Sequence, residues 1–226
     1  MFYASSTLRF LIFIVIVFLA VPFRPLHAQV PGECTKPAAG RPNEFGCYLL
    51  TETRIGQLSR RSAYWHIVRY ESAAAAAADQ LPRQTVVDSL GSHWLFAIGR
   101  RDWKPTGGKQ VAVIGPLPLS GARSYTARYM EAVSVHGFQS AIHRHSGPEA
   151  WYMISGTQCL ETPGHTLVVS AGNSSVVQAG PPMRLSTLGS TKRQALVLVL
   201  HDSDKPWVTM VDDWKPQGLC DGKVLP

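Results

Sequence analysis

The sequence predicts an all-β sandwich or barrel that follows a smaller α+β segment. From Lys109 onward, short runs of β-branched and aromatic residues alternate with turns rich in glycine and proline, which is the spacing that a sandwich or barrel requires. Before that point the pattern is mixed, because strand-like runs flank six consecutive alanines. The sequence shows no internal repeat and no second H-x-H, so a pair of barrels is not expected.

The first 28 residues have the organisation of a secretory signal peptide. Arg9 precedes an apolar run at residues 10–23, and the small Ala28 stands at a suitable cleavage site. This run is shorter than the roughly 20 apolar residues that a membrane-spanning helix needs. We therefore expect cleavage after Ala28, export to the periplasm or the medium, and no membrane association afterwards. An uncleaved anchor is the alternative, because Leu26 is large for its place near the cleavage site.

Residues 29–108 are expected to form an α+β extension rather than a linker. An irregular arm rich in proline and glycine, residues 29–46, leads into strand-like runs. The expected strands of the extension are residues 47–50, 64–70, 85–87 and 93–98. Ser72 can cap a short helix of alanines that ends near Leu81, and a low-complexity segment is the alternative. The proline and glycines of residues 103–108 mark the expected boundary with the barrel.

Residues 109–212 are expected to form the barrel, and residues 213–226 a C-terminal tail. About 198 residues remain after the signal peptide, enough for one domain with a sizeable core. The expected barrel strands are residues 110–114, 125–135, a hairpin that begins at residue 143, and residues 166–170, 175–177, 183–188 and 194–200. From Asp202 the chain is polar and contains prolines, so we expect it to wrap around the outside.

The chain is basic, with 22 Lys and Arg against 15 Asp and Glu and a formal net charge of +7. Loss of Arg9 and Arg24 with the signal peptide leaves a surplus of +5. Part of this surplus lies in short clusters, which we interpret as a solvated basic surface. The clusters are Arg60-Arg61, Arg100-Arg101 and Lys192-Arg193. Because export separates the protein from nucleic acid, a nucleic-acid partner is not expected.

Several common enzyme classes lack their motifs in this chain. There is no G-x-S-x-G elbow, no phosphate-binding glycine loop and no dinucleotide fingerprint after a strand. Hydrolases that use a G-x-S-x-G elbow and nucleotide-dependent enzymes are therefore not indicated.

Four cysteines in an exported protein are most simply explained by two disulfides. Three connectivities are open. We favour Cys34 with Cys47, which closes a loop rich in proline and glycine, and Cys159 with Cys220, which pins the tail to the barrel. No C-x-x-C spacing is present, so a zinc knuckle or a redox-active dithiol is not indicated.

The residues with the clearest chemistry lie within residues 137–156. His143 and His145 are two positions apart, so on a strand they project from the same face. Glu149 follows a turn at residues 146–148 and opens a run of aromatic and β-branched residues. A β-hairpin here would bring the carboxylate beside both imidazoles. Two imidazoles and a carboxylate form a donor set that suits a divalent metal ion, Fe, Mn, Ni or Zn, with coordination positions left open.

At these residues the sequence resembles the cupin family. The first motif of that family places a glycine, two histidines, a glutamate and a second glycine at fixed spacings. This chain meets it with Gly137, His143, His145, Glu149 and Gly156. The resemblance implies a jelly-roll barrel of the cupin type with a metal ion in its mouth, and it also implies a homodimer.

The second motif of the family is incomplete in this chain. Gly172 and Gly180 match its glycines. Gln178 stands where the family has a proline, and Met183 stands where it has a metal-binding histidine. A thioether is a soft, weak ligand that suits Cu(I) better than Fe, Zn or Mn. This chain therefore retains the glycines of the second motif, which shape the backbone, but lacks its metal-binding histidine.

Strand alternation indicates four candidate pocket residues. If Glu149 faces the metal, then Trp151 and Met153 face the same way. Met183 and Leu185 likewise share a face on a later strand. Their alternative role is as ordinary core, because a small barrel fills its interior with side chains.

Two functions fit the sequence. The first is an exported cupin that binds a divalent metal through His143, His145 and Glu149 together with a small organic ligand, as in a metal-dependent oxygenase or isomerase. The second is a non-catalytic cupin that binds a small molecule or has a structural role. Met183 favours the second function, because it leaves the ligand set one donor short. The fold does not choose among the reactions that it hosts.

Overall fold

The computed structural model describes residues 34–41, 44–59 and 63–223. Within them the chain forms fourteen strands and one α-helix. No helix in this part of the chain has both the length and the apolar character to cross a membrane. The expected signal peptide, residues 1–28, lies outside the described residues.

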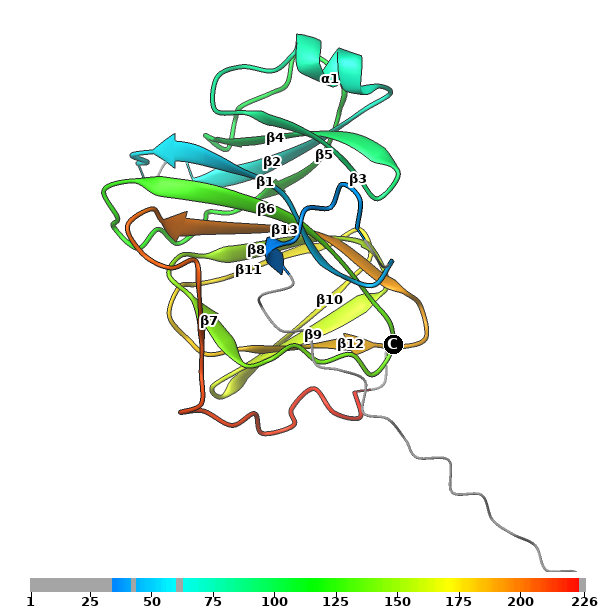
Figure 1. Ribbon diagram of the computed structural model, residues 1–226, viewed down its shortest axis with the longest axis vertical. Coiled ribbons are helices and arrows are strands. Elements are labelled where there is room, and N and C mark those ends of the chain that lie inside the picture. The colour runs from blue at the N-terminus through cyan, green and yellow to red at the C-terminus, as the bar shows by residue number, and fades with distance from the viewer. Residues whose placement is uncertain (1–33, 42–43, 60–62, 224–226) are drawn as a thin grey trace, which may run out of the picture.

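Two antiparallel walls enclose the barrel, which is the lower part of the molecule in Figure 1. One wall is a five-stranded sheet with the order β1-β6-β13-β8-β11. Its strands are β1 (Gly46–Gly56), β6 (Tyr125–Ser134), β8 (Glu149–Ser155), β11 (Ser174–Val177) and β13 (Arg193–Asp202). The other wall consists of a three-stranded sheet, β10-β9-β12, and a two-stranded sheet, β14-β7. Its strands are β7 (His143–His145), β9 (Thr157–Thr162), β10 (His165–Ser170), β12 (Arg184–Leu188) and β14 (Val208–Met210).

The connections between the strands are those of a jelly roll. From β6 to β14 the chain changes wall at each step except between β9 and β10, which form a hairpin within one wall. Side chains from both walls meet in one core that includes Met130, Trp151, Leu160 and Leu185. The fold class expected from the sequence, an all-β jelly roll with an N-terminal α+β extension, is confirmed.

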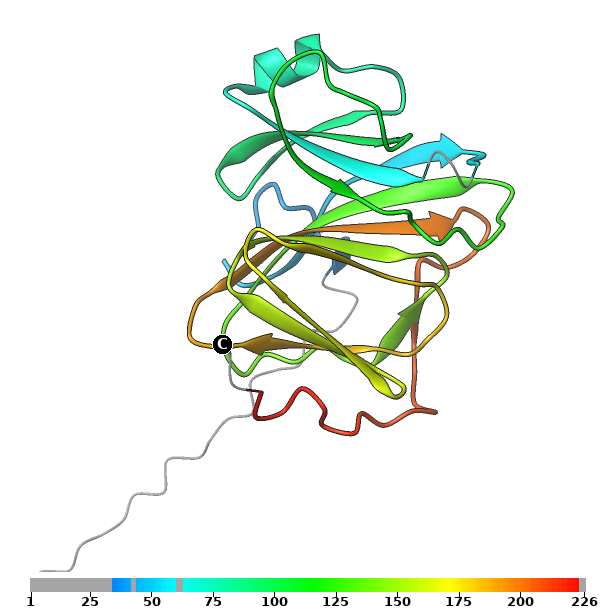
Figure 2. The same cartoon turned by 180° about the vertical axis from the view of Figure 1, so that it is seen from behind.

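A four-stranded sheet with the order β3-β4-β2-β5 forms the extension. Its strands are β2 (Tyr64–Tyr70), β3 (Thr85–Ser89), β4 (Ser92–Gly99) and β5 (Lys109–Ile114). This sheet packs on the outer face of the five-stranded wall, as Figure 2 shows from behind. Aromatic rings fill the interface, since the Phe96 ring centroid lies 5.5 Å from that of Trp65 and 5.0 Å from that of Tyr129 on β6.

Strands β6 and β13 are buried on both faces because each lies between two cores. On β6, Tyr129 packs against the extension, whereas Met130 faces the barrel interior. On β13, Leu196 likewise packs against the extension, and Val197 faces the barrel interior. Strands covered on both sides are nearly continuous apolar runs, and this is the pattern of residues 194–200.

The strand pairing does not follow the expected boundary at residue 108. Strand β1, expected in the extension, is the edge strand of the five-stranded barrel wall and pairs with β6. Strand β5, expected in the barrel, pairs with β2 in the extension. The proline and glycines of residues 103–108 do form a loop, but this loop connects two strands of one sheet. Loop composition marks a turn, whereas the sheet that the next strand joins depends on contacts with residues far away in the sequence.

Helix α1 (Ala73–Ala78) begins where the sequence indicates. Ser72 is its N-cap, and the Ser72 hydroxyl accepts a hydrogen bond of 3.1 Å from the backbone N–H of Ala75. The helix ends before Leu81, the expected end point. It lies on the side of the four-stranded sheet that faces away from the barrel (Figure 1).

Strand β9 is missing from the sequence-based expectation because polar residues interrupt its apolar pattern. Gln158 and Glu161 lie on this strand, and both are fully buried. Gln158 accepts a hydrogen bond of 2.8 Å from Arg193, and Glu161 pairs with Arg184 at 3.4 Å. Partners from other strands thus offset the cost of burying these polar groups.

The cysteines are paired as Cys34–Cys47 and Cys159–Cys220, which are the pairs favoured by the sequence. The two bonds close loops of very different length, because their sequence separations are 13 and 61 residues. Disulfides are typical of oxidising compartments, and this pairing is consistent with an extracellular protein.

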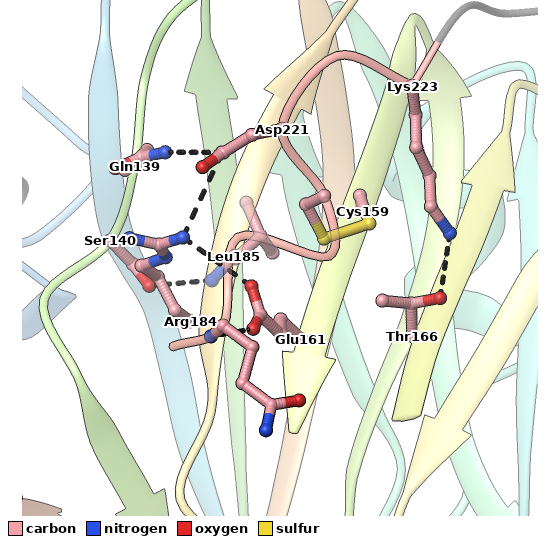
Figure 3. The surroundings of a disulfide bond; sticks show 11 residues. Gln139, Ser140, Cys159, Glu161, Thr166, Arg184, Leu185, Asp221 and Lys223 are labelled. Carbon is pink, nitrogen blue, oxygen red and sulfur yellow. Dashed lines mark hydrogen bonds and ion pairs between the residues drawn. A yellow bond between two sulfur atoms is a disulfide. The ribbon is translucent and has the colours of Figure 1, made fainter. Parts of the chain in front are cut away.

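The segment after Asp202 has two different roles. Its first part enters the barrel wall as β14, which corrects the expectation that the whole segment wraps around the outside. The later part runs over the three-stranded sheet, where Figure 3 shows its attachments. Asp221 lies 3.9 Å from Arg184, and Lys223 donates a hydrogen bond of 2.7 Å to Thr166.

Candidate metal centre

His143 and His145 lie on β7, which does not form the expected hairpin with β8. Strand β7 pairs with β14, whereas β8 pairs with β13 and β11 in the opposite wall. The turn between the histidines and Glu149 therefore crosses from one wall of the barrel to the other.

The close packing of Gly147 accounts for this crossing. A Cβ atom on Gly147 would lie 1.9 Å from the carbonyl oxygen of Leu200 on β13, so only glycine lets the turn pack directly on that strand. Next to it, the backbone N–H of Leu200 donates a hydrogen bond of 3.0 Å to the carbonyl oxygen of Pro148. These contacts direct the chain into the five-stranded wall instead of back along β7.

The crossing brings the three candidate ligands together. One ligand atom from each of His143, His145 and Glu149 lies within 4.8 Å of the other two. His145 and Glu149 are buried, with 3% and 7% of their surface exposed, and His143 is half-buried. No other group of three potential metal ligands is found in the part of the chain that the structure describes.

Backbone carbonyls fix which nitrogen of each histidine is free. Nδ1 of His143 lies 2.8 Å from the carbonyl oxygen of Ala141, and Nδ1 of His145 lies 2.8 Å from that of Trp207. A carbonyl oxygen only accepts, so each Nδ1 carries the proton. The lone pair of each neutral ring is then on Nε2, and an outer hydrogen bond of this kind orients histidines that bind metals.

Nε2 of His145 and Oε2 of Glu149 face each other in the site. The two atoms are 3.2 Å apart, and both are buried without a hydrogen-bond partner among the described residues. When the ring is neutral and Nδ1 is the donor, both facing atoms are acceptors; an imidazolium would instead form an ion pair with Glu149. Two buried acceptors in contact are costly unless a cation lies between them.

The environment of His143 also favours its neutral form. Burial lowers the pKa of His143, and the neighbouring His145 lowers it further, while Glu149 acts in the opposite direction. A neutral imidazole is the form that binds a metal ion.

Trp207 covers the site from the segment that precedes β14. Its ring stacks on that of His145, with centroids 5.5 Å apart and an interplanar angle of 20°. The guanidinium carbon of Arg128 lies 4.3 Å from the centroid of the same ring. Sequence reasoning missed both residues, because neither belongs to a motif and their contacts join distant segments.

A cavity of about 70 Å³ opens beside the three ligands, which is room for several water molecules. Three of the four candidate pocket residues line it, namely Trp151, Met183 and Leu185. Met153 does not line it; its side chain is fully buried in the core, and its backbone is opposite Ala195. Alternation places Met153 on the inner face of β8, as expected, but its depth in the barrel depends on the register with β13.

Met183 is the neighbour of His143 across two short segments. The two residues exchange backbone hydrogen bonds of 2.8 and 3.2 Å, so their side chains project from the same face. Met183 is completely buried and lines the cavity. The thioether thus lies on the wall of the site, beside His143.

Arg193 also lines the cavity, although the sequence placed it in a surface cluster. Only 2% of this residue is exposed. Gly156, the last glycine of the first motif, packs closely against the backbone of Arg193. It has a φ of +69°, and a Cβ atom there would lie 2.8 Å from Cα of Arg193. The signal that could have revealed Arg193 is alternation, since it precedes the inward-facing Ala195 and Val197 by two and four positions.

No protein-family model matches the sequence, and no curated protein matches it. Solved structures do match. A cupin-superfamily protein from Desulfitobacterium hafniense is 12% identical over 34% of this chain and 68% of its own, with a TM-score of 0.32. A double-stranded β-helix protein from Klebsiella pneumoniae is 17% identical over 38% of this chain and 76% of its own, with a TM-score of 0.34.

A third match is a DMSP lyase from Ruegeria pomeroyi, which is 18% identical over 37% of this chain, with a TM-score of 0.33. The match covers 42% of the lyase. In this chain itself, two walls joined by alternating connections enclose the core, and the first motif from Gly137 to Gly156 is complete. The barrel therefore has the cupin-type jelly-roll fold.

Proposed function

We propose that this protein is an exported cupin that holds a divalent metal ion through His143, His145 and Glu149 and binds a small organic molecule beside it. The observation that carries the proposal is the convergence of one ligand atom from each of the three residues within 4.8 Å of one another, with Nε2 of His145 and Oε2 of Glu149 buried 3.2 Å apart. A cation bound by these atoms would satisfy the buried carboxylate and both neutral imidazoles.

The donor set narrows the choice of metal. Two imidazole nitrogens and one carboxylate oxygen suit Fe, Mn, Ni or Zn, whereas the thioether of Met183 adds little for these ions. Three protein ligands leave coordination positions free for water or for an organic ligand. Such an ion, when bound, acts as a Lewis acid toward an oxygen atom of that ligand.

The protein contributes orientation and a dry surrounding. The carbonyl groups of Ala141 and Trp207 hold both imidazoles with Nε2 toward the site. Apolar side chains of Trp151, Leu160 and Val197 line the cavity and limit the access of water. We assign the protein to the metal-dependent enzymes that convert small organic molecules, as oxygenases and isomerases do.

A binding protein without turnover is the second candidate. The observation in its favour is the lack of a further acid or base: apart from the three ligands, Arg193 is the one ionisable side chain in the lining that the structure describes. Arginine stays protonated and is therefore a poor proton donor or acceptor.

Metal analysis separates the two candidates. The protein should be purified from the periplasm or the medium without added metal or chelator, and its metal content measured by mass spectrometry. One equivalent of Fe, Mn, Ni or Zn per chain supports the enzyme, whereas a folded protein without metal supports the binding protein. Sequencing of the amino terminus tests export, because a mature chain that begins at Gln29 shows cleavage after Ala28.

A further inference from the structure

The guanidinium of Arg193 is buried without an anionic partner in contact. Its Nε donates a hydrogen bond of 2.8 Å to Oε1 of Gln158. Only 2% of the residue is exposed, and it lines the cavity, where no carboxylate of the described residues forms an ion pair with it. Burial lowers the pKa of Arg193 to about 10, while the charge of Glu149 acts in the opposite direction. The fold thus holds a buried guanidinium in the wall of the cavity, where an anion from outside the chain can pair with it.

This charge lies at the far end of the same cavity. On β13 the inward positions are Arg193, Ala195, Val197 and Val199, and Val199 is opposite Glu149. The metal ligands therefore lie six positions along the strand from Arg193, about 20 Å between the backbone positions. The long arginine side chain shortens this gap, since both Arg193 and Glu149 line the cavity.

Small and apolar side chains occupy the space between the two ends. Ala195 and Ala132 are opposite each other, next to Arg193 along the inner face, and Ala132 lines the cavity. Met130 and Val197 form the next pair of the lining. The cavity thus has an apolar middle, a cationic floor at Arg193 and the three candidate ligands at its other end.

We propose that the cavity takes a small organic acid, with its carboxylate bound by Arg193 and its opposite end directed toward the metal ligands. The second half of this statement rests on the proposed function. The planar guanidinium matches a carboxylate in a bidentate manner. With a divalent cation bound, the single Glu149 carboxylate leaves the cavity with an excess of positive charge, and an acid offsets this excess. The apolar middle fits a short hydrocarbon chain.

The experiment compares a carboxylate with its neutral isostere. Binding of butyrate and of butyramide is measured by calorimetry on the full mature chain, once after removal of metal by a chelator and once after loading with Mn²⁺. Butyrate is expected to bind at least about tenfold more tightly than butyramide in both samples, a difference of 1.4 kcal/mol. Equal affinities for the two compounds would overturn the proposal.

Variants then assign the effect to Arg193. Arg193→Met is expected to remove the preference for butyrate, and Arg193→Lys, which keeps the charge but not the planar fork, to retain part of it. Arg100→Met is the matched control, since Arg100 is exposed on the extension and pairs with Asp102. A preference for butyrate that is unchanged in Arg193→Met would sink the idea. If Arg193→Met does not fold, the proposal is still tested by the relative affinities of butyrate and butyramide for the wild type and for Arg193→Lys.

The metal content of the same samples keeps the two proposals apart. A chain that binds no Mn²⁺ but prefers butyrate through Arg193 contradicts the proposed metal site and supports the anion site. A chain that binds Mn²⁺ without a preference for butyrate supports the metal site and contradicts the anion site.

Discussion

The carbonyl oxygen of Trp207 accepts a hydrogen bond of 2.8 Å from Nδ1 of His145, while the indole ring of the same residue stacks on the imidazole. One residue thus sets both the tautomer and the tilt of a candidate ligand. Trp207 comes 62 positions later in the sequence and lies in a segment whose composition suggested an outer wrap. The site is therefore complete only when the chain beyond β13 has returned to the barrel.

Metal occupancy should depend on three residues and hardly on a fourth. His143→Ala or Glu149→Ala leaves two protein donors, and we expect metal affinity to fall by more than about 100-fold, the upper end of the loss for an outer partner of a ligand. Met183→Leu is close in volume and should keep both fold and metal. Competition with a chromophoric chelator measures these affinities. Loss of metal in Met183→Leu with retention in Glu149→Ala would identify the thioether as a ligand and favour copper.

Met183→His should strengthen metal binding. Met183 lies beside His143 with its side chain on the same face, so an imidazole at this position can supply a fourth donor. We expect a gain in affinity of at least about tenfold, or 1.4 kcal/mol. Met183→Gln, which offers only a weak amide oxygen, serves as the control. Equal affinities of Met183→His and the wild type would show that the residue does not point at the ion.

Gly147→Ala should destabilise the barrel and disturb the site. The added Cβ would lie 1.9 Å from a backbone oxygen that cannot rotate away, so β7, β8 or β13 has to move. We expect a loss of about 1–3 kcal/mol, as for other overpacked positions, together with weaker metal binding. Gly99→Ala is the matched control, because its Cβ would meet nothing closer than 3.7 Å. Urea denaturation measures both, and similar values for the two variants would contradict the close approach.

The two disulfides should differ in their contribution to stability. In the chain-entropy account, closing a loop of 61 residues contributes about 4 kcal/mol and closing one of 13 residues about 3 kcal/mol. Replacement of Cys159 and Cys220 by alanine is therefore expected to lower the free energy of unfolding more than replacement of Cys34 and Cys47. Nonreducing peptide mapping first establishes the pairs, and four free thiols in the native protein would refute both bonds.

Cleavage near Lys104 should not release an independent barrel. Lys104 is exposed in the loop between β4 and β5, and β5 is held by its pairing with β2. Trp65 and Trp94 are also buried, with 0% and 3% exposed. We expect nicked protein to elute as a single species in gel filtration and to separate only in denaturant. A stably folded fragment that starts near residue 109 would contradict this integration.

Local patterns were sufficient where neighbours in the sequence are also neighbours in space. The Ser72 cap and the alanine helix depend on contacts within one turn, and the strands at residues 64–70 and 194–200 depend on their own apolar content. Strand β9 escaped detection because its buried Gln158 and Glu161 accept contacts from arginines on other strands, through Oε1 of Gln158 and a carboxylate oxygen of Glu161. A pattern of single residues cannot contain that information.

The sequence by itself determined a sandwich or barrel, the helix with its cap, and the three candidate ligands, because a motif of fixed spacing and strand periodicity are local properties; the jelly-roll class was implied by the resemblance to the cupin family. Only the tertiary structure decided which strands share a sheet. Strand β1, which precedes residue 108, belongs to the barrel wall, and β5, which follows it, belongs to the extension. The tertiary structure also decided that His143 and Glu149 meet from opposite walls, that Trp207 orients His145, and that Arg193 faces the cavity. Each of these outcomes depends on pairing between segments far apart in the chain, and the free energy of that pairing comes from the shared core rather than from any one stretch of residues.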